Sequence, residues 1–355
     1  MTMQTFGLSA GRINKYKGAI LAHAVPQECL SRAGRQVKFP KNNSDTYVAR
    51  RWIPYGATST QPNTFFGTTT AVDRGNLIVQ AHQTAEGVTP VPESIVPMDV
   101  SVVMVQYSCL YGFTDKTYDL YEDDVPQAMV QQVGERVTLV NELIMFGVLK
   151  AGTNQFYGGT GTTRATVNGG ITLNMVRKMA KSLMANHGGM VTSVLEASGK
   201  YNTEAVAGGF LVYCHTDLEP DIRDLPGFIP AEKYASGTPM ANELGKVERF
   251  RFITSPEFVA IIEGGAAIGA TGLGSSNPSA TNIDVYQFIV TAADAWSQVA
   301  VRGLESLDPT FLPPGQKTKS DPHGQRGYAG TTWWKAAMIE NQGWLAIGNV
   351  GVKAL

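Results

Sequence analysis

A long amphipathic stretch at residues 124–150 constrains the fold of this chain more than any other feature. Its apolar side chains recur at steps of three or four residues, which places them on one stripe of an α-helix: Met129, Val133, Val137, Val140 and Ile144. Asp123 and Asp124 supply an N-terminal cap and a favourable charge, whereas Lys150 and Gly152 mark the end. At about 1.5 Å per residue such a helix is roughly 40 Å long. The sequence therefore predicts one helix as long as a small domain is wide.

The region before this helix is polar and is interrupted repeatedly by proline and glycine. Residues 37–54 contain two short β-prone segments around a polar KNNSD turn, which predicts a hairpin. Prolines recur as far as residue 97, and residues 100–111, rich in Val, Met and Tyr, are a strong strand candidate. An arm of this length is hard to bury within its own subunit. We therefore expect another chain to cover it.

Beyond the long helix, the sequence predicts a mixture of helix and strand. Residues 171–186 predict a second helix, with Thr172 as its cap. Residues 209–215 and 246–254 predict strands, the second of them half-buried, and residues 333–352 predict a closing β element. The fold class is therefore α+β. We expect the stripe of the long helix to pack on the second helix and on the closing element.

The composition argues against several classes of protein. The chain has 355 residues, 43% hydrophobic and 17% charged, which is enough to bury one or two cores. Nucleic-acid-binding proteins usually carry a dense basic face, so a net charge of −1 predicts only diffuse contact with DNA. Cys29, Cys109 and Cys214 are odd in number and far apart, which favours free thiols in a reducing compartment. No segment resembles a signal peptide or a membrane span, so we expect a soluble chain made in the cytosol.

The sequence offers few groups for catalysis. His215 and Asp217 would share one face of a strand, which is compatible with a metal site or an acid–base pair, but a strand-end pair satisfied by backbone or solvent is the favoured interpretation. Residues 158–163 are rich in glycine but lack the Lys-Ser/Thr ending of a phosphate-binding loop, so a flexible hairpin is favoured. Residues 264–274 are typical of a mobile surface loop, or of a tip that becomes ordered on contact with neighbours. We expect no catalytic residue, no cofactor and no metal ion.

A series of short motifs runs from about residue 37 to the carboxyl terminus. The motifs are Arg50-Arg51-Trp52, Glu86-Gly87-Val88-Thr89-Pro90, Gly112-Phe113-Thr114-Asp115, Asp221-Ile222-Arg223-Asp224, Gly227-Phe228-Ile229-Pro230, Tyr234, Glu243-Leu244-Gly245, Arg249-Phe250-Arg251-Phe252, Asp284-Val285-Tyr286, Ser320-Asp321-Pro322 and Gly324-Gln325. In their order and spacing they resemble the major capsid proteins of tailed bacteriophages. More narrowly, the chain resembles the branch found in short-tailed phages related to coliphage N-four.

The resemblance implies the Hong Kong 97-like fold. In that fold we expect an N-terminal arm at residues 1–36, an extended loop at 37–112 and a peripheral domain at 113–205 that contains the long helix as its spine. An axial domain at 206–324 and a closing strand of the peripheral domain at 325–355 would complete the subunit.

The resemblance also implies a function. A major capsid protein self-assembles, as pentamers and hexamers, into the icosahedral shell that encloses the phage genome. The implied partners are a separate scaffolding protein, a portal, a cement or decoration protein and packaged double-stranded DNA, with no membrane. The chain would be a late structural protein of the virion capsid, made in the cytoplasm of the host bacterium. Three alternatives stay open: another virion protein, associated with the tail or the portal, a soluble hydrolase that uses His215 and Asp217, and a nucleic-acid-binding module that uses Arg50 and Arg51.

Residues of the expected hairpin and its surroundings are candidates for contact between subunits. The candidate interface residues are Arg50, Arg51, Trp52, Glu86, Thr89 and Asp115. We expect the two arginines to pair with Glu86 or Asp115 of an adjoining subunit. Residues 264–281 are expected near a five-fold or six-fold axis, where a glycine-rich segment can adopt several slightly different conformations.

Overall fold

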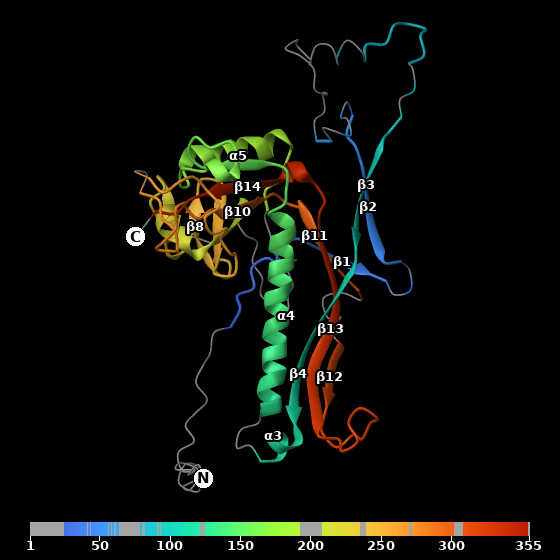
Figure 1. Cartoon of the computed structure of the whole chain (residues 1–355). Helices are drawn as coiled ribbons and strands as arrows, with labels where there is room; N and C mark the ends of the chain where they lie inside the picture. The colour runs from blue at the N-terminus through green and yellow to red at the C-terminus, as the bar shows by residue number, and fades with distance from the viewer. Residues whose placement is uncertain are drawn as a thin grey trace.

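The computed structural model describes most of the chain. The described residues are 25–40, 42, 44–55, 57, 59, 62–63, 79, 82–90, 92, 94–120, 125–191, 208–234, 239–269, 272–301 and 308–353. They form a five-stranded sheet with one long helix along it, a seven-stranded sheet with shorter helices, and a two-stranded hairpin that projects from the body (Figure 1). This mixture agrees with the predicted α+β class. Residues 1–24 of the expected N-terminal arm lie outside the described residues.

The five-stranded sheet is built around one long strand, β13 (Arg326–Ile339). One edge of β13 pairs with β4 (Val105–Thr114). The other edge pairs first with β12 (Asp308–Leu312) and then with β11 (Trp296–Val301). β1 (Arg35–Phe39) is added in parallel to β11. The sheet is therefore long and narrow, with the N-terminal strand on its outer edge.

The seven-stranded sheet is mixed and mostly buried. Its strands, in spatial order, are β5 (Gln155–Tyr157), β14 (Leu345–Val350), β10 (Tyr286–Thr291), β6 (Phe210–His215), β9 (Phe250–Ser255), β8 (Glu243–Val247) and β7 (Phe228–Pro230). Strands β10 and β14 are buried along their whole length, which is why their sequences are runs of mostly apolar residues and do not alternate. α6 (Glu219–Arg223) packs on this sheet through Ile222.

The predicted second helix is confirmed as α5 (Leu173–Ala185). The Thr172 hydroxyl accepts a hydrogen bond from the Met175 amide at 3.3 Å, as an N-cap residue does. The apolar stripe of α5 is buried against the seven-stranded sheet: Met175, Val176, Met179, Ala180 and Leu183. Each fully buried side chain of this size contributes about 1.5–3 kcal/mol. The position of α5 is thus fixed by that sheet.

The predicted long helix is confirmed as α4 (Val125–Leu149), while its proposed caps Asp123 and Asp124 lie outside the described residues. Of its stripe, Val133 and Val137 are buried against β4 and β13, and the other three members are half-buried. The expected contact of the stripe with the second helix is wrong, because α5 buries its own stripe in a different core. Among the described helices, none is both long enough and apolar enough to cross a membrane.

The hairpin predicted at residues 37–54 is wrong in its partner. β2 (Thr46–Trp52) pairs with β3 (Pro97–Val103) and not with β1. β1 instead buries Phe39 beside Met104 in a small apolar core. Pairing of β1 with β2 across a short turn would not bring Phe39 into this core. The strand candidate at residues 100–111 is divided between β3 and β4 at Met104, whose amide donates to the Asp45 carbonyl at 2.8 Å.

Residues 246–254 predict one half-buried strand, but two strands occupy this segment. β8 ends at Val247 and β9 begins at Phe250, with Glu248 at a φ of 52° in the turn between them. β9 is buried on both faces, because Phe252 belongs to the core under α5 and Ile253 belongs to the core on the opposite side of the sheet. The prediction of a half-buried strand is therefore wrong.

A junction core connects the two sheets. α4 contributes the residues of its last turns, the seven-stranded sheet contributes β6, β9 and β14, and the five-stranded sheet contributes β11 and β13. Its largest members are Met145, Phe146, Leu149, Tyr213, Phe258 and Trp296. The predicted closing element is accordingly divided, since β13 lies in one sheet and β14 in the other. The junction core holds the described residues together as one body.

Candidate functional site

The hairpin of β2 and β3 is the part of the molecule that extends farthest from the two sheets among the described strands (Figure 1). One of its faces is anchored, because Tyr47 and Val102 pack on the small core that contains Phe39 and Met104. The opposite face is open, with Val48 and Trp52 51% and 58% exposed. The root of the hairpin is therefore fixed to the body while its outer face is free to contact another surface.

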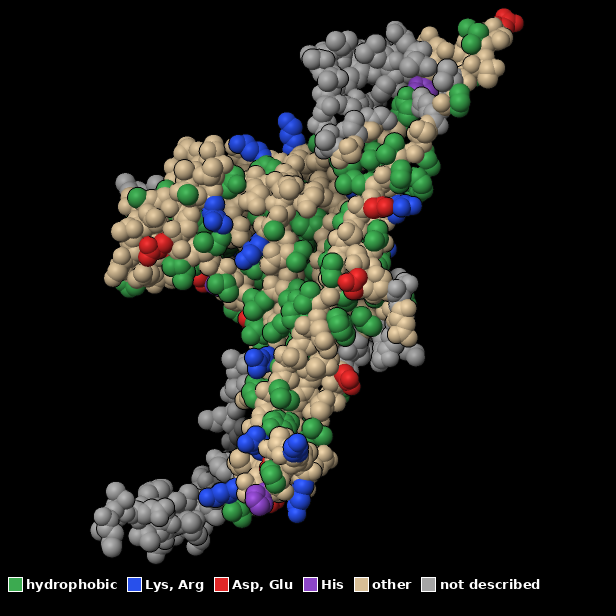
Figure 2. All heavy atoms as spheres, turned by 45° about the vertical axis from the view of Figure 1, so that its right-hand side comes forward, with side chains coloured by type: hydrophobic (Ala, Val, Ile, Leu, Met, Phe, Trp, Pro, Cys, Tyr) green, Lys and Arg blue, Asp and Glu red, His purple; other side chains and the backbone are tan. Residues whose placement is uncertain are grey.

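Hydrophobic side chains gather over this hairpin and the adjoining part of the body (Figure 2). On the outer face, Val103 is exposed by more than half, as are Val48 and Trp52. An isolated two-stranded hairpin is marginally stable in water, and clustered exposed apolar side chains mark contact surfaces. The outer face has the properties of a surface that another protein covers.

The predicted interface arginines point to opposite faces of this hairpin. Arg50 lies on the outer face and donates two hydrogen bonds, of 2.7 and 2.8 Å, to the carboxylate of Asp99 directly across the ladder. Hydrogen bonding by Arg50 holds the pKa of Asp99 below its ordinary value. Arg51 faces the body, where burial lowers its pKa against the opposing effect of Glu340. Arg50 thus has a partner within its own chain, which the sequence did not suggest.

The other predicted interface residues lie apart from these arginines. Glu86 and Thr89 are exposed in the connection between β2 and β3. Asp115 begins α3 (Asp115–Leu120), at the end of the body opposite to the hairpin (Figure 1). Within one chain the structure therefore brings Arg50, Arg51 and Trp52 together but places Asp115 far from them. A contact with Asp115 would have to come from another copy.

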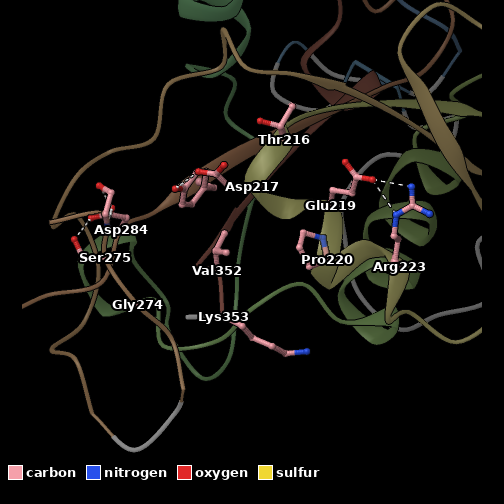
Figure 3. A pocket seen from close by; sticks show the side chains of 12 residues that line it. Thr216, Asp217, Glu219, Pro220, Arg223, Gly274, Ser275, Asp284, Val352 and Lys353 are labelled. Carbon is pink, nitrogen blue, oxygen red and sulfur yellow. Dashed lines mark hydrogen bonds and ion pairs between the residues drawn. The ribbon is translucent and has the colours of Figure 1, made fainter. Parts of the chain in front are cut away.

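A cavity of about 700 Å³ lies beside the seven-stranded sheet, between α6, the turn that precedes it and the loop at residues 274–276 (Figure 3). Its acidic groups already have partners within the chain. The Tyr286 hydroxyl donates to Asp217 at 2.7 Å, and the Arg223 guanidinium donates to Glu219 at 2.9 and 2.7 Å. These carboxylates support the fold around the cavity.

His215 has a structural role at the rim of this region. Its Nδ1 accepts a hydrogen bond from the Asp217 amide at 3.0 Å and so caps the turn at Thr216–Leu218. The carboxylate of Asp217 also lies 3.3 Å from Nδ1, but a nitrogen that accepts from the backbone cannot donate to that carboxylate. The geometry agrees with the strand-end interpretation. Among the described residues, no group of three or more His, Cys, Asp or Glu side chains could hold a metal ion.

The glycine-rich residues 158–163 form a closed turn. A Cβ at Gly158 would lie 2.2 Å from the carbonyl oxygen of Gly169, so the two backbone segments are in direct contact. The Thr160 amide donates to the side chain of Asn168 at 2.9 Å, which fastens the turn. The Thr160 amide is thus bonded within the chain.

Comparison with known proteins identifies the fold. No protein-family model matches the chain. Over 260 residues it is 22% identical to the major capsid protein of Pseudomonas phage KPP21, an alignment that covers 67% of this chain and 64% of that protein. The chain thus spans about 64% of the length of that relative. An identity this low calls for structural comparison.

Solved capsid structures match the chain along nearly its whole length. The capsid protein of Ralstonia phage GP4 has a TM-score of 0.64 at 11% identity, covering 100% of this chain and 99% of that chain. The cyanophage Pam1 capsid matches with a TM-score of 0.55 at 12% identity, covering 99% and 100%. The chain has the fold of phage capsid proteins. The Hong Kong 97-like architecture that the sequence resemblance implied is confirmed at this level.

Within this capsid fold, a buried ion pair supports the edge of the seven-stranded sheet. Arg251 donates two hydrogen bonds to Glu243, of 2.7 and 2.6 Å, and both side chains are almost fully buried. Glu243 also accepts from the Tyr234 hydroxyl at 2.6 Å and from the Met240 amide at 2.8 Å. Burial and the bond to Glu243 raise the pKa of Tyr234. The sequence resemblance used three of these four residues, but nothing in their spacing indicated that they meet.

Asp284 fastens the glycine-rich loop of the capsid fold. Its buried carboxylate accepts four hydrogen bonds of 2.7–2.9 Å, from the Glu263 amide, from the Ser275 hydroxyl, and from the amide and hydroxyl of Ser276. Burial by itself raises the pKa of Asp284, but these bonds outweigh burial and hold the pKa below its ordinary value. Residues at both ends of the segment expected to be a mobile loop are thereby attached to Asp284, two residues before β10 begins.

We predict that Asp284→Asn destabilises this loop in a pH-dependent way. The folded pKa of Asp284 lies below the unfolded value of about 4, so its contribution is complete above about pH 5 and is lost as the pH falls through the folded pKa. At neutral pH the variant should lose about 1–3 kcal/mol. Urea unfolding of both proteins measures this difference, which should shrink as the pH is lowered towards 3. A difference that does not depend on pH would contradict the role of the charged carboxylate.

Proposed function

We propose that the protein is the major capsid protein of a tailed phage and that its copies assemble into the icosahedral shell around the genome. The likeness to capsid subunits over the full length of both chains supports this function, as does the relative that bears this name. The observation that carries the proposal is the projecting hairpin, anchored on one face and open on the other. The protein acts by assembly and has a structural rather than an enzymatic function.

The hairpin supplies the kind of contact that a thin shell requires. Specific protein interfaces bury about 1,200–2,000 Å² in total, and a head-to-tail contact repeated around an axis closes into a ring. The open face with Val48, Trp52 and Val103 meets the next copy, while the root stays attached to its own body. Trp52 is the strongest candidate for the centre of this interface, because exposed tryptophans are enriched at binding hot spots. The partners are arranged as pentamers and hexamers.

The two sheets correspond to the two domains of the subunit. The peripheral domain contains α4 and the five-stranded sheet, and the axial domain contains the seven-stranded sheet with α5 and α6. This division differs from the one expected from the sequence, because it assigns β5, α5 and β14 to the axial domain and β11 and β12 to the peripheral domain. The extended loop is the segment from β2 to β3. Residues 264–281 lie near a symmetry axis, at the end of the axial domain.

The branch related to coliphage N-four is the finer assignment that we propose. Four motif residues of that resemblance make polar contacts in the interior of the protein: Tyr234, Glu243, Arg251 and Asp284. We further propose a separate scaffolding protein, a portal and a cement or decoration protein as partners. The net charge of −1 supports diffuse contact with packaged DNA. The free, buried thiols support synthesis in the reducing cytoplasm of a bacterium.

Electron microscopy of the purified chain, with and without its scaffolding protein, tests the proposed function. Closed shells of uniform size are expected when the scaffolding protein is present. Rings or tubes would instead indicate a tail or portal component. A persistent monomer with a hydrolytic activity that His215→Ala abolishes would indicate an enzyme and would overturn the proposal.

The pairing of Arg50 with Asp99 makes a prediction about the hairpin. Arg50→Asp places two carboxylates opposite each other on the ladder, so we expect fewer shells in sedimentation assays. The exchange Arg50→Asp with Asp99→Arg restores the pair and should restore assembly. If the exchanged protein assembles as poorly as the single variant, Arg50 acts on a neighbouring subunit and not on its own hairpin.

A further inference from the structure

A strap of chain at residues 28–34 lies in the junction between the two sheets. Leu30 is fully buried in the junction core, where Cys29 and Ala33 accompany it. Cys29 also contacts the seven-stranded sheet, since its Sγ lies 3.8 Å from the Thr254 carbonyl and accepts from Asn242 at 3.5 Å. The strap then continues into β1 on the edge of the five-stranded sheet. It therefore contacts both sheets.

Glu142 of α4 holds the start of the strap. Its carboxylate is fully buried and accepts four hydrogen bonds, from the amides of Cys29, Leu30 and Ser31 at 3.1, 2.9 and 2.8 Å and from the Ser31 hydroxyl at 2.7 Å. A buried carboxylate is unfavourable unless its acceptor positions are used. Because three of the donors are backbone amides, the side chain of Glu142 binds mainly the main chain of the strap.

Gln298 of β11 holds the same strap from the five-stranded sheet. Its buried side-chain nitrogen donates to the carbonyls of Leu30, Ser31 and Ala33 at 3.1, 3.1 and 2.6 Å. Its side-chain oxygen accepts from the buried amine of Lys335 at 2.7 Å, which fixes the orientation of the amide. The amides of the strap thus point to α4 and its carbonyls point to β11.

The charges around Lys335 belong to the same network. Burial lowers the pKa of Lys335 to about 8, while Glu142 of α4 and Glu28 of the strap oppose this effect. Buried between these groups, the lysine provides a cation near the carboxylate that binds the strap. At the end of the strap, Gly34 has a φ of 75°, and a Cβ there would lie 2.7 Å from the ring of Trp296. The backbone of the strap therefore contacts Glu142 at its start and the ring of Trp296 at its end.

We propose that the strap is a lock that holds the five-stranded and seven-stranded sheets in one relative position, with Glu142 and Gln298 as its fastening residues and Lys335 as the residue that orients Gln298. The strap buries Leu30 between the sheets, and the fastening residues bind it almost entirely through backbone groups. The strap can therefore dissociate from the junction as one segment. When it leaves, the junction core loses the side chains of Cys29, Leu30 and Ala33. This inference is independent of the proposed function.

Thiol labelling of the full-length chain tests whether Glu142 fastens the strap. Cys29, Cys109 and Cys214 are free and buried in three different cores, so each thiol reports on its own region. In Glu142→Gln one carboxylate oxygen becomes an NH2 group, so either the Leu30 amide or the group of donors from Cys29 and Ser31 meets another donor. We therefore expect maleimide to label Cys29 at least about tenfold faster. Cys214 should remain as slow as in the wild type. Glu135→Gln on the same helix is the matched control and should leave Cys29 protected.

An unchanged labelling rate of Cys29 in Glu142→Gln overturns the proposal. If this variant instead exposes all three thiols together, the milder Ser31→Ala decides, because it removes only the hydroxyl contact with Glu142. A rise confined to Cys29 then supports the lock. A rise at all three thiols, or at none, overturns it.

Coupling between the sheets is measured by the distance between two spin labels. Exposed positions suit the labels: Ser108→Cys on β4 and Lys181→Cys on α5, in a Cys29→Ser background. We expect Glu142→Gln to broaden the distance distribution relative to Glu135→Gln. Release of Cys29 together with an unchanged distribution would mean that the strap is fastened without locking the sheets, and it would overturn the proposal.

Discussion

The double variant Val48→Glu with Trp52→Glu should form no shells while the free subunit remains folded. Both side chains are more than half exposed on the outer face of the hairpin, so in the monomer their replacement should change the free energy of unfolding by less than about 0.5 kcal/mol. In the proposed assembly the same face is buried, and a hot-spot residue there contributes about 2 kcal/mol or more. Every subunit repeats the loss. Sedimentation and electron microscopy measure shell formation, and circular dichroism measures folding.

Val130→Glu is the matched control for this experiment. Val130 lies on the exposed side of α4 and is 51% exposed, the same value as Val48. It therefore receives a glutamate in place of an equally exposed valine, on a surface that the proposal does not use. We expect Val130→Glu to assemble. Normal shells from the hairpin variant, or loss of assembly in both proteins, would contradict an interface centred on Trp52.

The largest effect on stability is expected for Glu243→Ala. The substitution leaves the guanidinium of Arg251 buried without its carboxylate, and it also removes the acceptor of the Tyr234 hydroxyl and the Met240 amide. Breaking a buried pair from one side costs about 3–5 kcal/mol, a large part of the stability of an ordinary domain. Urea unfolding monitored by tryptophan fluorescence gives the loss in the free energy of unfolding.

A double variant distinguishes the effect of the charges of this pair from the effect of the volume of its side chains. In Glu243→Leu with Arg251→Met both charges are absent and most of the volume is retained, so we expect the double variant to be more stable than Glu243→Ala. The Arg177–Glu248 pair provides a surface control, because both of its side chains are well exposed. Glu248→Ala should have little effect. A similar loss for Glu248→Ala and Glu243→Ala would show that burial does not decide the cost.

Helices were predictable from the sequence because their signals are local. The long helix differs from α4 by one residue at each end, and the Thr172 cap of α5 makes the predicted hydrogen bond. Periodicity reveals which side of a helix is apolar, but it does not identify the surface that covers it. Of the two surfaces expected to cover the stripe of α4, the closing element is confirmed through Trp333 of β13, whereas the second helix is wrong.

Strand partners were not predictable, because pairing joins distant segments. β1 and β2 are separated by a polar turn that is typical of a hairpin, yet each pairs with a strand far along the chain. The first pairing is favoured by Phe39, whose partners Met104 and Val299 cannot be inferred from the local pattern. At 246–254 the turn at Glu248 has no glycine or proline to mark it, so the strand seemed continuous.

Candidate site residues were predicted unevenly for a similar reason. Trp52, a candidate for contact between subunits, is exposed on the hairpin, and its place in an interface stays a prediction, whereas Asp99, the partner of Arg50, was not a candidate. Glu142 gave no signal at all, because a single glutamate in a helix looks like a solvated residue. Only the three-dimensional arrangement shows that its carboxylate meets the amides of a segment more than a hundred residues earlier.

The ladder between β4 and β13 has a mechanical consequence. A neighbour that pulls on the hairpin transmits tension through β3 and Met104 into β4, along the direction of that strand. The paired residues of β4 and β13, from Val105–Lys335 to Thr114–Arg326, are then loaded together in shear. They do not separate one pair at a time. The ladder of the hairpin itself, from Thr46–Val103 to Trp52–Pro97, is shorter. Under internal pressure the subunit should therefore yield first at the root of the hairpin, while the ladder along α4 stays intact.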